Sequence, residues 1–464
     1  MKTQLKICLA VLLAVFVLAP GTGWGKGPKV KKGMIEFSVP ARVKGQTDVL
    51  GLRCDPIPTV RVAFIGLGMR GSMAVGRFTY LDGVQVVALC DVRPECVAAA
   101  QRTLAAAGMP AAAEYTGEED WKKVCEREDV DLVYNCTQWE LHTPIAVYAM
   151  RHGKHVALEV PAAFTIDECW QLVDAAEQTR RHCMMLENCC YDFFEMATLN
   201  MAQQGLFGDI MHVEGAYIHD LRSLNLETDD RSGYYKMWRL NYNEKHTGNP
   251  YPTHGLGPVC QILNIHRGDR MDYLVSVSSA QKGISVAAEE KFGRDSEFAR
   301  RDYSLGDMNT TVIRTAKGKT IMIQHDVTSP RPYDRLHMIS GTKGFAQKYP
   351  VEGIALEPNA HSFLPKPQMD SLMARYEHPL AKEIGEKARQ VGGHGGMDFI
   401  MDYRLIYCLQ NGLPLDQDVY DAAEWSSLVE LTETSVKHNG MPVRIPDFTR
   451  GAWNRTKGFS MATK

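Results

Sequence analysis

The first half of the chain alternates short apolar runs with amphipathic segments. Five apolar runs bounded by turn residues predict buried strands: Val60–Ile65, Val84–Cys90, Val130–Thr137, His155–Val160 and Cys183–Glu187. Helical patterns fill the gaps between them, at residues 72–78, 94–107, 118–126, 142–151 and 165–181. The last of these opens with Thr165-x-x-Glu168, the pattern of a capping box. Strands and helices that alternate with short connections predict a doubly wound parallel sheet of the Rossmann type.

After residue 190 the pattern changes to alternating strands. Such strands are expected at residues 212–217, 274–279, 308–315 and 320–326, with a hairpin turn at Lys317-Gly318. Residues 220–258 show no clear period and are rich in Tyr, Asn, Gly, Arg and His, so we expect a long functional loop there and a helix starting near Pro258. The fold class is therefore α/β, with an α+β domain, built on a mostly antiparallel open sheet, after the Rossmann domain.

The start of the chain has the order of a secretory signal. Lys2 and Lys6 precede the apolar run 7–19, and small residues follow at Gly23 and Gly25. Thirteen apolar residues are too few to span a bilayer comfortably. We expect an exported protein, periplasmic or secreted, whose mature chain has no membrane span. The expected divisions are a signal peptide at 1–25, an extension at 26–57, a nucleotide domain at 58–190 and a substrate domain at 191–464.

Composition narrows the classes of partner. The net charge of the 464 residues is −3, and no Lys/Arg cluster is interleaved with aromatics, so we expect no nucleic-acid partner. The twelve cysteines include no CxxC pair and no zinc-like spacing, so we expect no metal, while one disulfide stays open. An antiparallel sheet with one open face favours a homo-oligomer.

The strongest motif is a glycine turn between the first strand and its helix. Gly66-x-Gly68-x-x-Gly71 supplies the tight turn, the close approach to a pyrophosphate and the close helix packing that a dinucleotide needs. Asp91 follows the second strand, twenty residues after Gly71, where a carboxylate accepts hydrogen bonds from a ribose. The acid favours NAD over NADP, although Arg93 lies close by.

Further polar residues follow the other strands or gather in the second domain. The strand ends contribute the loop 138–142, Glu159-Val160-Pro161, Asn188 and Tyr191, which should converge on one crevice. The second domain adds Arg239, Tyr251 and His254. A cation, phenols and a group that titrates near neutrality are what a sugar site requires. The plainer interpretation is that His254 caps the helix near Pro258 and Tyr251 packs at the rim.

Several strings resemble the NAD-dependent α-N-acetylgalactosaminidases, family 109 of the glycoside hydrolases, within the Gfo/Idh/MocA oxidoreductase superfamily. They are Glu159-Val-Pro-Ala-Ala, Met185-Leu-Glu-Asn188, Tyr217-Ile-His-Asp-Leu-Arg222, Tyr251-Pro-Thr-His-Gly-Leu-Gly-Pro258 and Asn264-Ile-His-Arg-Gly-Asp-Arg270. The resemblance implies NAD contacts at Met69, Arg70, Asp91, Trp139, His142, Glu159, Val160 and Asn188. It implies substrate contacts at Tyr191, Arg239, Tyr251, Pro252, Thr253, His254 and Tyr333, with His254, Tyr191 and Tyr251 as candidates for catalysis.

The resemblance also implies a reaction. The sugar C3 hydroxyl is oxidised transiently by tightly bound NAD, the C2 proton becomes acidic, the aglycone leaves by elimination, water adds and the sugar is reduced again. NAD-dependent glycosidases are exceptions to the two-carboxylate scheme. The expected substrate is an N-acetylgalactosaminide. Two alternatives are an NAD-dependent sugar or inositol oxidoreductase and a sugar-binding protein without activity. Val160 stands where dehydrogenases of the superfamily usually carry lysine, which weighs against the oxidoreductase.

Overall fold

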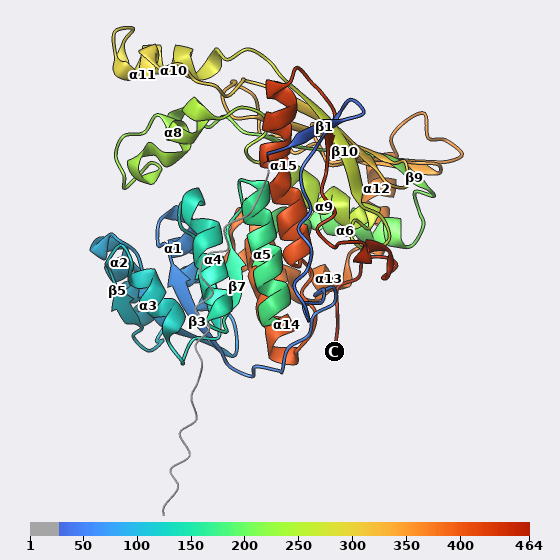
Figure 1. The fold of residues 1–464 in the computed structure, drawn as a ribbon. Coiled ribbons are helices and arrows are strands. Elements are labelled where there is room, and N and C mark those ends of the chain that lie inside the picture. Colours follow the sequence, from blue (N-terminus) through green and yellow to red (C-terminus); the bar gives the residue numbers. More distant parts are fainter. Residues whose placement is uncertain (1–26) are drawn as a thin grey trace, which may run out of the picture.

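The computed structural model describes residues 27–464, so the expected signal peptide lies outside the described residues. Within 27–464, no helix is long and apolar enough to cross a membrane. The chain forms a parallel sheet flanked by helices and a second, larger sheet beside it (Figure 1).

The first sheet confirms the predicted doubly wound fold. Its six parallel strands have the order β5-β4-β3-β6-β7-β8. Their bounds are β3 Val60–Ile65, β4 Val84–Cys90, β5 Ala113–Tyr115, β6 Leu132–Asn135, β7 His155–Leu158 and β8 Cys183–Met185. The strand order reverses between β3 and β6, and in such sheets ligands bind at the carboxyl ends beside this switch.

The helices of the first domain fall close to their predicted positions. They are α1 Met69–Phe78, α2 Pro94–Ala106, α3 Asp120–Glu126, α4 His142–Arg151 and α5 Ile166–Thr179. The capping box before α5 is present, because Thr165 Oγ1 accepts from the Glu168 amide and the Glu168 carboxylate accepts from the Thr165 amide. Helix α1 begins three residues earlier than predicted, directly after Gly68.

The second sheet confirms the mostly antiparallel α+β domain. Its ten strands have the order β1-β2-β16-β10-β11-β12-β9-β13-β14-β15, and only the β9–β12 and β2–β16 pairs are parallel. The bounds are β1 Lys29–Lys31, β2 Met34–Glu36, β9 Ile210–Ile218, β10 Met271–Ser278, β11 Asn309–Thr315, β12 Thr320–Asp326, β13 Met338–Gly341, β14 Gly344–Gln347, β15 Gly353–Leu356 and β16 Val443–Arg444. The predicted hairpin joins β11 to β12, with Gly318 at φ +86°.

The prediction of one long loop at 220–258 is wrong. This stretch contains α7 Arg222–Asn225, a short 3-10 helix Tyr235–Met237, α8 Trp238–Lys245 and the start of α9 Thr253–Leu263. Helix α8 shows no apolar period because its aromatic side chains pack on Trp139, whose ring centroid lies 4.6 Å from that of Trp238. Helix α9 begins five residues before Pro258. Its Gly255 permits close packing on β9, since a Cβ there would lie 2.5 Å from the Ala216 nitrogen.

The C-terminal helices bind the two predicted domains together. The remaining helices of the second region are α6 Phe193–Gln203, α10 Gly283–Phe292, α11 Glu297–Arg300, α12 Lys366–Arg375, α13 Pro379–Val391, α14 Met397–Asn411 and α15 Val419–Lys437. On α14, Asp402 accepts hydrogen bonds from Arg77 of α1 and from the Tyr134 hydroxyl of β6, both at 2.7 Å. A single apolar core therefore includes residues from both regions.

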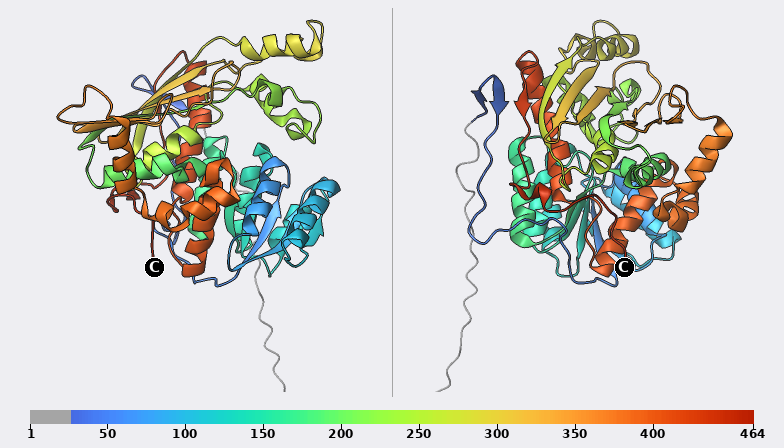
Figure 2. Two further views of the ribbon diagram at one scale, coloured as in Figure 1. Left: turned by 180° about the vertical axis from the view of Figure 1, so that it is seen from behind. Right: turned by 90° about the vertical axis from the view of Figure 1, so that its right-hand side faces the viewer.

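The N-terminal extension is fastened along the outside of both regions (Figure 2). Strands β1 and β2 form a hairpin, and Ile35 of β2 pairs with Val443 of β16. Further on, Arg42 forms an ion pair with Glu177 of α5 at 2.7 Å. The extension thus serves as a tie between the large sheet and the nucleotide domain.

The question of a disulfide is answered for the described part of the chain. All eleven cysteines between residues 27 and 464 are free, and eight of them are buried. Burial raises the pKa of Cys90 to about 12, so this thiol behaves as a small apolar group.

Candidate functional site

The glycine turn has the geometry that a dinucleotide requires. Gly66 has φ +85°, and a Cβ on Gly71 would lie 1.9 Å from the Gly66 carbonyl oxygen, so neither position accepts a side chain. Gly68 precedes the first residue of α1, whose free amides therefore face the carboxyl edge of the sheet. A Cβ at Gly68 would approach only the Arg93 guanidinium, at 3.2 Å. The turn leaves its outer side open to a pyrophosphate.

Asp91 lies beside this turn, as the sequence predicts. One of its carboxylate oxygens accepts from the Leu67 amide at 2.6 Å, and the other accepts from the Arg93 amide at 2.9 Å. The carboxylate thereby fixes the turn while it occupies the place of a ribose-binding acid at the end of β4. These residues fit NAD.

Arg70 organises the next part of the crevice. Its Nε donates to Glu159 at 3.0 Å, and its Nη1 donates to Asp398 of α14 at 3.1 Å. The Asn188 amide also donates to Asp398, at 2.5 Å. Burial alone raises the pKa of Asp398, but His394 and the guanidinium groups outweigh burial and hold it well below its ordinary value. Arg70, Glu159 and Asn188 therefore meet as predicted, through an aspartate that the sequence did not indicate.

Three other predicted cofactor residues, Met69, Val160 and His142, differ from one another in burial and in hydrogen bonding. Met69, the first residue of α1, is exposed, and Val160, two residues after the end of β7, is buried. The His142 ring is buried, with Nδ1 at 2.7 Å from the Pro161 carbonyl oxygen and Nε2 at 3.0 Å from that of Thr137. Burial lowers the pKa of His142. The His142 side chain thus links the loop at Thr137 to the loop at Pro161, and both of its ring nitrogens already have a backbone carbonyl partner.

Arg239 is enclosed in a box of aromatic rings. Its guanidinium carbon lies 4.8 Å from the Tyr251 ring centroid and 5.1 Å from that of Trp139. Nη1 donates to the Tyr234 hydroxyl at 3.1 Å, whereas Nε and Nη2 are buried without a partner. A buried donor without a partner costs free energy. A ligand oxygen in the box would satisfy both donors.

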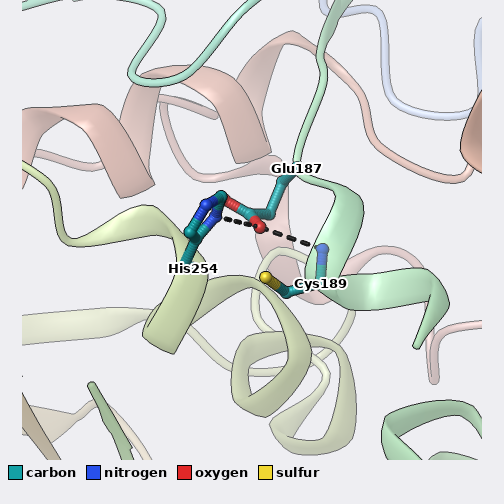
Figure 3. A group of neighbouring side chains, drawn as sticks. All are labelled: Glu187, Cys189 and His254. Atoms are coloured by element: carbon teal, nitrogen blue, oxygen red, sulfur yellow. Dashed lines mark hydrogen bonds and ion pairs between the residues drawn. The ribbon is translucent and has the colours of Figure 1, made fainter. Parts of the chain in front are cut away.

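His254 and Glu187 face each other (Figure 3), and the His254 ring centroid lies 4.9 Å from that of Tyr251 in the aromatic box. His254 lies in the first turn of α9, and its Nδ1 is 2.7 Å from Oε1 of Glu187, which is fully buried after β8. Burial raises the pKa of Glu187, but His254 outweighs burial and the pKa falls below its ordinary value. The carboxylate therefore fixes the proton on Nδ1 and leaves Nε2 as the basic nitrogen.

Three more aromatic residues complete the crevice. The Tyr217 ring on β9 lies 5.2 Å from the His254 ring and 4.6 Å from the Tyr251 ring. Its hydroxyl is 3.0 Å from Nδ1 of His219. Tyr333 is more exposed and contacts His219 at the rim, with ring centroids 5.0 Å apart. Pro252 directly precedes α9 and Thr253 is its first residue, and these two lie between Tyr251 and His254 in the sequence.

The prediction for Tyr191 needs correction. Its side chain is fully buried, and its hydroxyl is 3.3 Å from Asp416, which is itself paired with Arg404 at 2.7 Å. Burial raises the pKa of Tyr191 well above its ordinary value. The ring thus lies in the core beneath the crevice, and the phenol at the site is that of Tyr217.

The sequence indicated some of these functional residues only indirectly. Glu187 ends the fifth predicted strand, so the rule of strand carboxyl ends would have found it one residue before Asn188. Tyr217 and His219 belong to a string quoted for the family resemblance, without a role. Asp398 gave no local signal, because it reaches the crevice from α14, more than two hundred residues later.

Glu187, Cys189 and His254 also form a group with metal-ligand chemistry, with ligand atoms within 4.8 Å of one another. The Arg335 guanidinium lies 2.8 Å from the Cys189 sulfur, and the Glu187 carboxylate is bonded to His254. A cation there would be repelled by Arg335 and would displace a formed hydrogen bond. The donor set fits a proton-transfer site better than a metal site.

Solved structures with this fold bind nicotinamide cofactors. A levoglucosan dehydrogenase in complex with NADH and levoglucosan is 16% identical, with a TM-score of 0.61 over 84% of this chain and 100% of that chain. An inositol dehydrogenase homologue from Azotobacter vinelandii, complexed with NADH and myo-inositol, is 15% identical, with a TM-score of 0.61 over 85% of this chain and 100% of that chain. At these identities the likeness establishes the fold.

The family models and the sequence relatives identify the family, whereas the solved structures establish only the fold. Residues 60–187 match the oxidoreductase family with an NAD-binding Rossmann fold, and residues 191–455 match the C-terminal domain of glycosyl hydrolase 109. An alpha-N-acetylgalactosaminidase of Bacteroides fragilis is 59% identical over 89% of this chain and 97% of its own length. A glycosyl hydrolase family 109 protein of Bacteroides thetaiotaomicron is 50% identical over 98% of this chain and 99% of its own. With its NAD-binding domain and its glycosidase domain, the chain belongs to glycosyl hydrolase family 109.

Proposed function

We propose that this glycoside hydrolase cleaves N-acetylgalactosaminides with a tightly bound NAD that is regenerated in every turnover. One observation carries the proposal: the Glu187–His254 pair and the two unpartnered donors of Arg239 lie on either side of Tyr251, whose ring centroid is 4.9 Å from that of His254 and 4.8 Å from the Arg239 guanidinium carbon. The relative named as an alpha-N-acetylgalactosaminidase supports the substrate class.

His254 is the proton acceptor of the site. Its Nε2 is the free basic nitrogen because Nδ1 is held by Glu187 at 2.7 Å. When bound, NAD supplies a temporary oxidation at C3 of the sugar, which makes the neighbouring C2 proton acidic. His254 then takes a proton from the substrate, and the positive charge that it gains is balanced by the buried Glu187 carboxylate. The same imidazolium can return the proton later in the cycle.

The aromatic box holds the sugar. The Trp139 and Tyr251 rings are stacked at 27° with centroids 6.1 Å apart, and the Arg239 guanidinium lies close to both. Apolar ring faces suit the CH-rich face of a pyranose, and Arg239 can donate to its hydroxyl or acetamido oxygens. No second carboxylate is needed across the glycosidic bond, since elimination replaces direct displacement.

A net sugar oxidoreductase is the alternative function, favoured by the dehydrogenases that share the fold. Val160 weighs against it, because its side chain cannot transfer protons and is 4% exposed. The two functions differ in what accumulates. An oxidoreductase produces NADH in step with oxidised sugar, whereas the proposed hydrolase releases aglycone without net NADH.

The test uses nitrophenyl N-acetylgalactosaminides of both anomers, with and without added NAD. We expect aglycone release without NADH accumulation and incorporation of deuterium from D2O at C2 of the product. His254→Ala should abolish release while the purified protein keeps its NAD, and the exposed His152→Ala should behave as wild type. Full activity in His254→Ala, or a product without deuterium at C2, would refute the mechanism.

We also propose that the protein is exported through cleavage of a signal peptide near Gly25. The basic, apolar and small-residue segments at 1–25 support this proposal. Mass spectrometry of the mature protein from the native host should give an N-terminus near residue 26. An intact Met1 would contradict export by this route.

The open face of the large sheet supports a homo-oligomer. Val277 and Val312, on the neighbouring strands β10 and β11, are 60% and 48% exposed. Exposed apolar residues that cluster on a sheet commonly mark an interface. Sedimentation should give a mass above that of one chain, and Val312→Lys should reduce it.

A further inference from the structure

A cavity lies at the C-terminal end of helix α9, opposite the end that carries His254. Its volume is about 480 Å³, and its lining includes Lys317, Lys319, Lys457, Trp453 and Asp269. These residues come from three segments: the β11–β12 hairpin, the loop after α9 and the C-terminal tail. None of them belongs to the catalytic crevice.

Hydrogen bonds hold the walls of this cavity in place. The Gly268 amide donates to the Trp453 carbonyl oxygen at 2.9 Å, and the Gly458 amide donates to that of Arg267 at 2.7 Å. The Lys317 amide donates to Asp269 Oδ1 at 3.1 Å. The cavity is therefore preformed, and a ligand would not have to order it.

The lining carries an excess of free positive charge. Among the described residues, Lys317, Lys319 and Lys457 form no ion pair, whereas Arg267 is bonded to Asp421 at 2.7 Å. Burial lowers the pKa of Lys319, and Asp269 offsets burial only in part. An anionic group in the cavity would be attracted by these lysine ammonium groups.

Asp269 makes the cavity unlike a simple anion site. Its side chain is 1% exposed, and its Oδ2 has no hydrogen-bond partner. A small inorganic anion would be repelled by this carboxylate, whereas a hydroxyl group would donate to it. Trp453 adds a half-buried aromatic side chain, the type on which pyranose rings pack. Acceptor, aromatic ring and ammonium groups together match a saccharide that carries an acidic group.

Two elements connect this cavity to the catalytic crevice. Helix α9 carries His254 in its first turn and is capped by Asn264 at the cavity, and eleven residues span about 16 Å. Strand β12 starts beside Lys319 and ends at Asp326, close to Tyr217, a path of about 20 Å. A glycan chain of a few residues could reach from one site to the other over the surface.

We propose that this cavity is a secondary binding site for an anionic saccharide, a sulfated or uronate-bearing sugar unit. It would hold an acidic part of a glycan while the crevice acts on a terminal residue. The second half of this statement rests on the proposed glycosidase function, but binding at the cavity does not.

The test measures binding of a sulfated N-acetylhexosamine disaccharide to the full-length mature protein by calorimetry. We expect binding by wild type, and a loss of at least about fivefold in affinity in the double variant Lys319→Gln/Lys457→Gln and in Trp453→Ala. The exposed Lys44→Gln should bind as wild type. The desulfated disaccharide and inorganic sulfate should each bind at least about tenfold more weakly.

Hydrolysis of a nitrophenyl glycoside is measured in the same variants and should be unchanged, which also shows that they fold. Equal affinity for the sulfated and desulfated sugars, or no effect of the lysine substitutions on binding, would overturn the proposal. Inorganic sulfate that binds as tightly as the sugar would also overturn it. A protein that binds the disaccharide but cleaves no glycoside would refute the glycosidase function and leave the cavity site standing.

Discussion

Oε1 of Glu187 lies 2.7 Å from Nδ1 of His254, and the carboxylate is fully buried. The pair comes from the end of β8 in the nucleotide domain and the first turn of α9 in the substrate domain. The proposed active site is therefore assembled across the two domains, and the orientation of His254 depends on a carboxylate that is buried beneath it.

Glu187→Gln should lower kcat by about 10²–10⁴-fold, because a neutral amide does not stabilise the imidazolium and can select the wrong tautomer. NAD content after purification should be unchanged. The pH dependence of kcat should shift, which a purely structural defect would not cause. The exposed Glu386→Gln on α13 is the matched control. A Glu187→Gln variant with wild-type kcat and pH profile would show that the pair is not part of the proton transfer.

Arg239→Lys should reduce kcat/KM by about 10²-fold, mainly by raising KM. The ammonium keeps the charge but loses the planar group that lies between Tyr251 and Trp139 and the two free donors. The measurement is steady-state kinetics on a nitrophenyl N-acetylgalactosaminide, and the exposed Arg231→Lys variant is the control. An unchanged KM would show that the substrate does not engage the guanidinium.

Tyr191→Phe should retain activity within about twofold and lose about 1 kcal/mol of stability, the value of one hydrogen bond. The reason is that its hydroxyl contacts Asp416 in the core. Tyr217→Phe should instead lower kcat, since the Tyr217 hydroxyl lies in the crevice beside His219. Chemical denaturation and kinetics on both variants separate the two roles. If Tyr191→Phe lost activity at normal stability, the Tyr191 hydroxyl would have a role in the reaction.

The buried pair His266–Glu424 should give stability that depends on pH. The His266 Nε2 lies 2.5 Å from a Glu424 oxygen, without the alignment of a hydrogen bond. Burial lowers the pKa of His266, but Glu424 outweighs it and the pKa rises to about 9. The stabilisation is present below the unfolded pKa of about 6.5 and is lost as pH rises through 9, on the order of 3 kcal/mol.

Urea unfolding between pH 6 and 10 tests this expectation. Wild type should lose stability across the window from about 6.5 to 9, and His266→Gln should be less stable at pH 6 with a flatter profile. The exposed His152→Gln should follow wild type. A wild-type profile that is flat through this window would show that His266 is neutral in the folded protein.

Local patterns predicted the elements whose signals lie within a few residues. The strands of the parallel sheet, the capping box at Thr165 and the glycine turn with Asp91 all follow from neighbouring side chains. Helix α8 escaped prediction because its aromatic residues pack on Trp139 of the other domain, so its sequence has no apolar stripe. The start of α9 was misplaced because Gly255 and Gly257 resemble turn residues, whereas Gly255 permits close packing on β9.

The sequence alone determined that this protein has a dinucleotide fold, and that Arg70, Asp91, Glu159 and Asn188 share one edge of it. The carboxyl ends of the parallel strands lie at that edge in any sheet of this type, independently of the second domain. Only the tertiary structure decided which groups gather around the proposed sugar site. In the fold, Tyr191 lies in the core and Tyr217 lies beside His254, His254 pairs with Glu187, and Asp398 contacts Arg70. The direction of each of these side chains depends on packing between segments that are far apart in the chain.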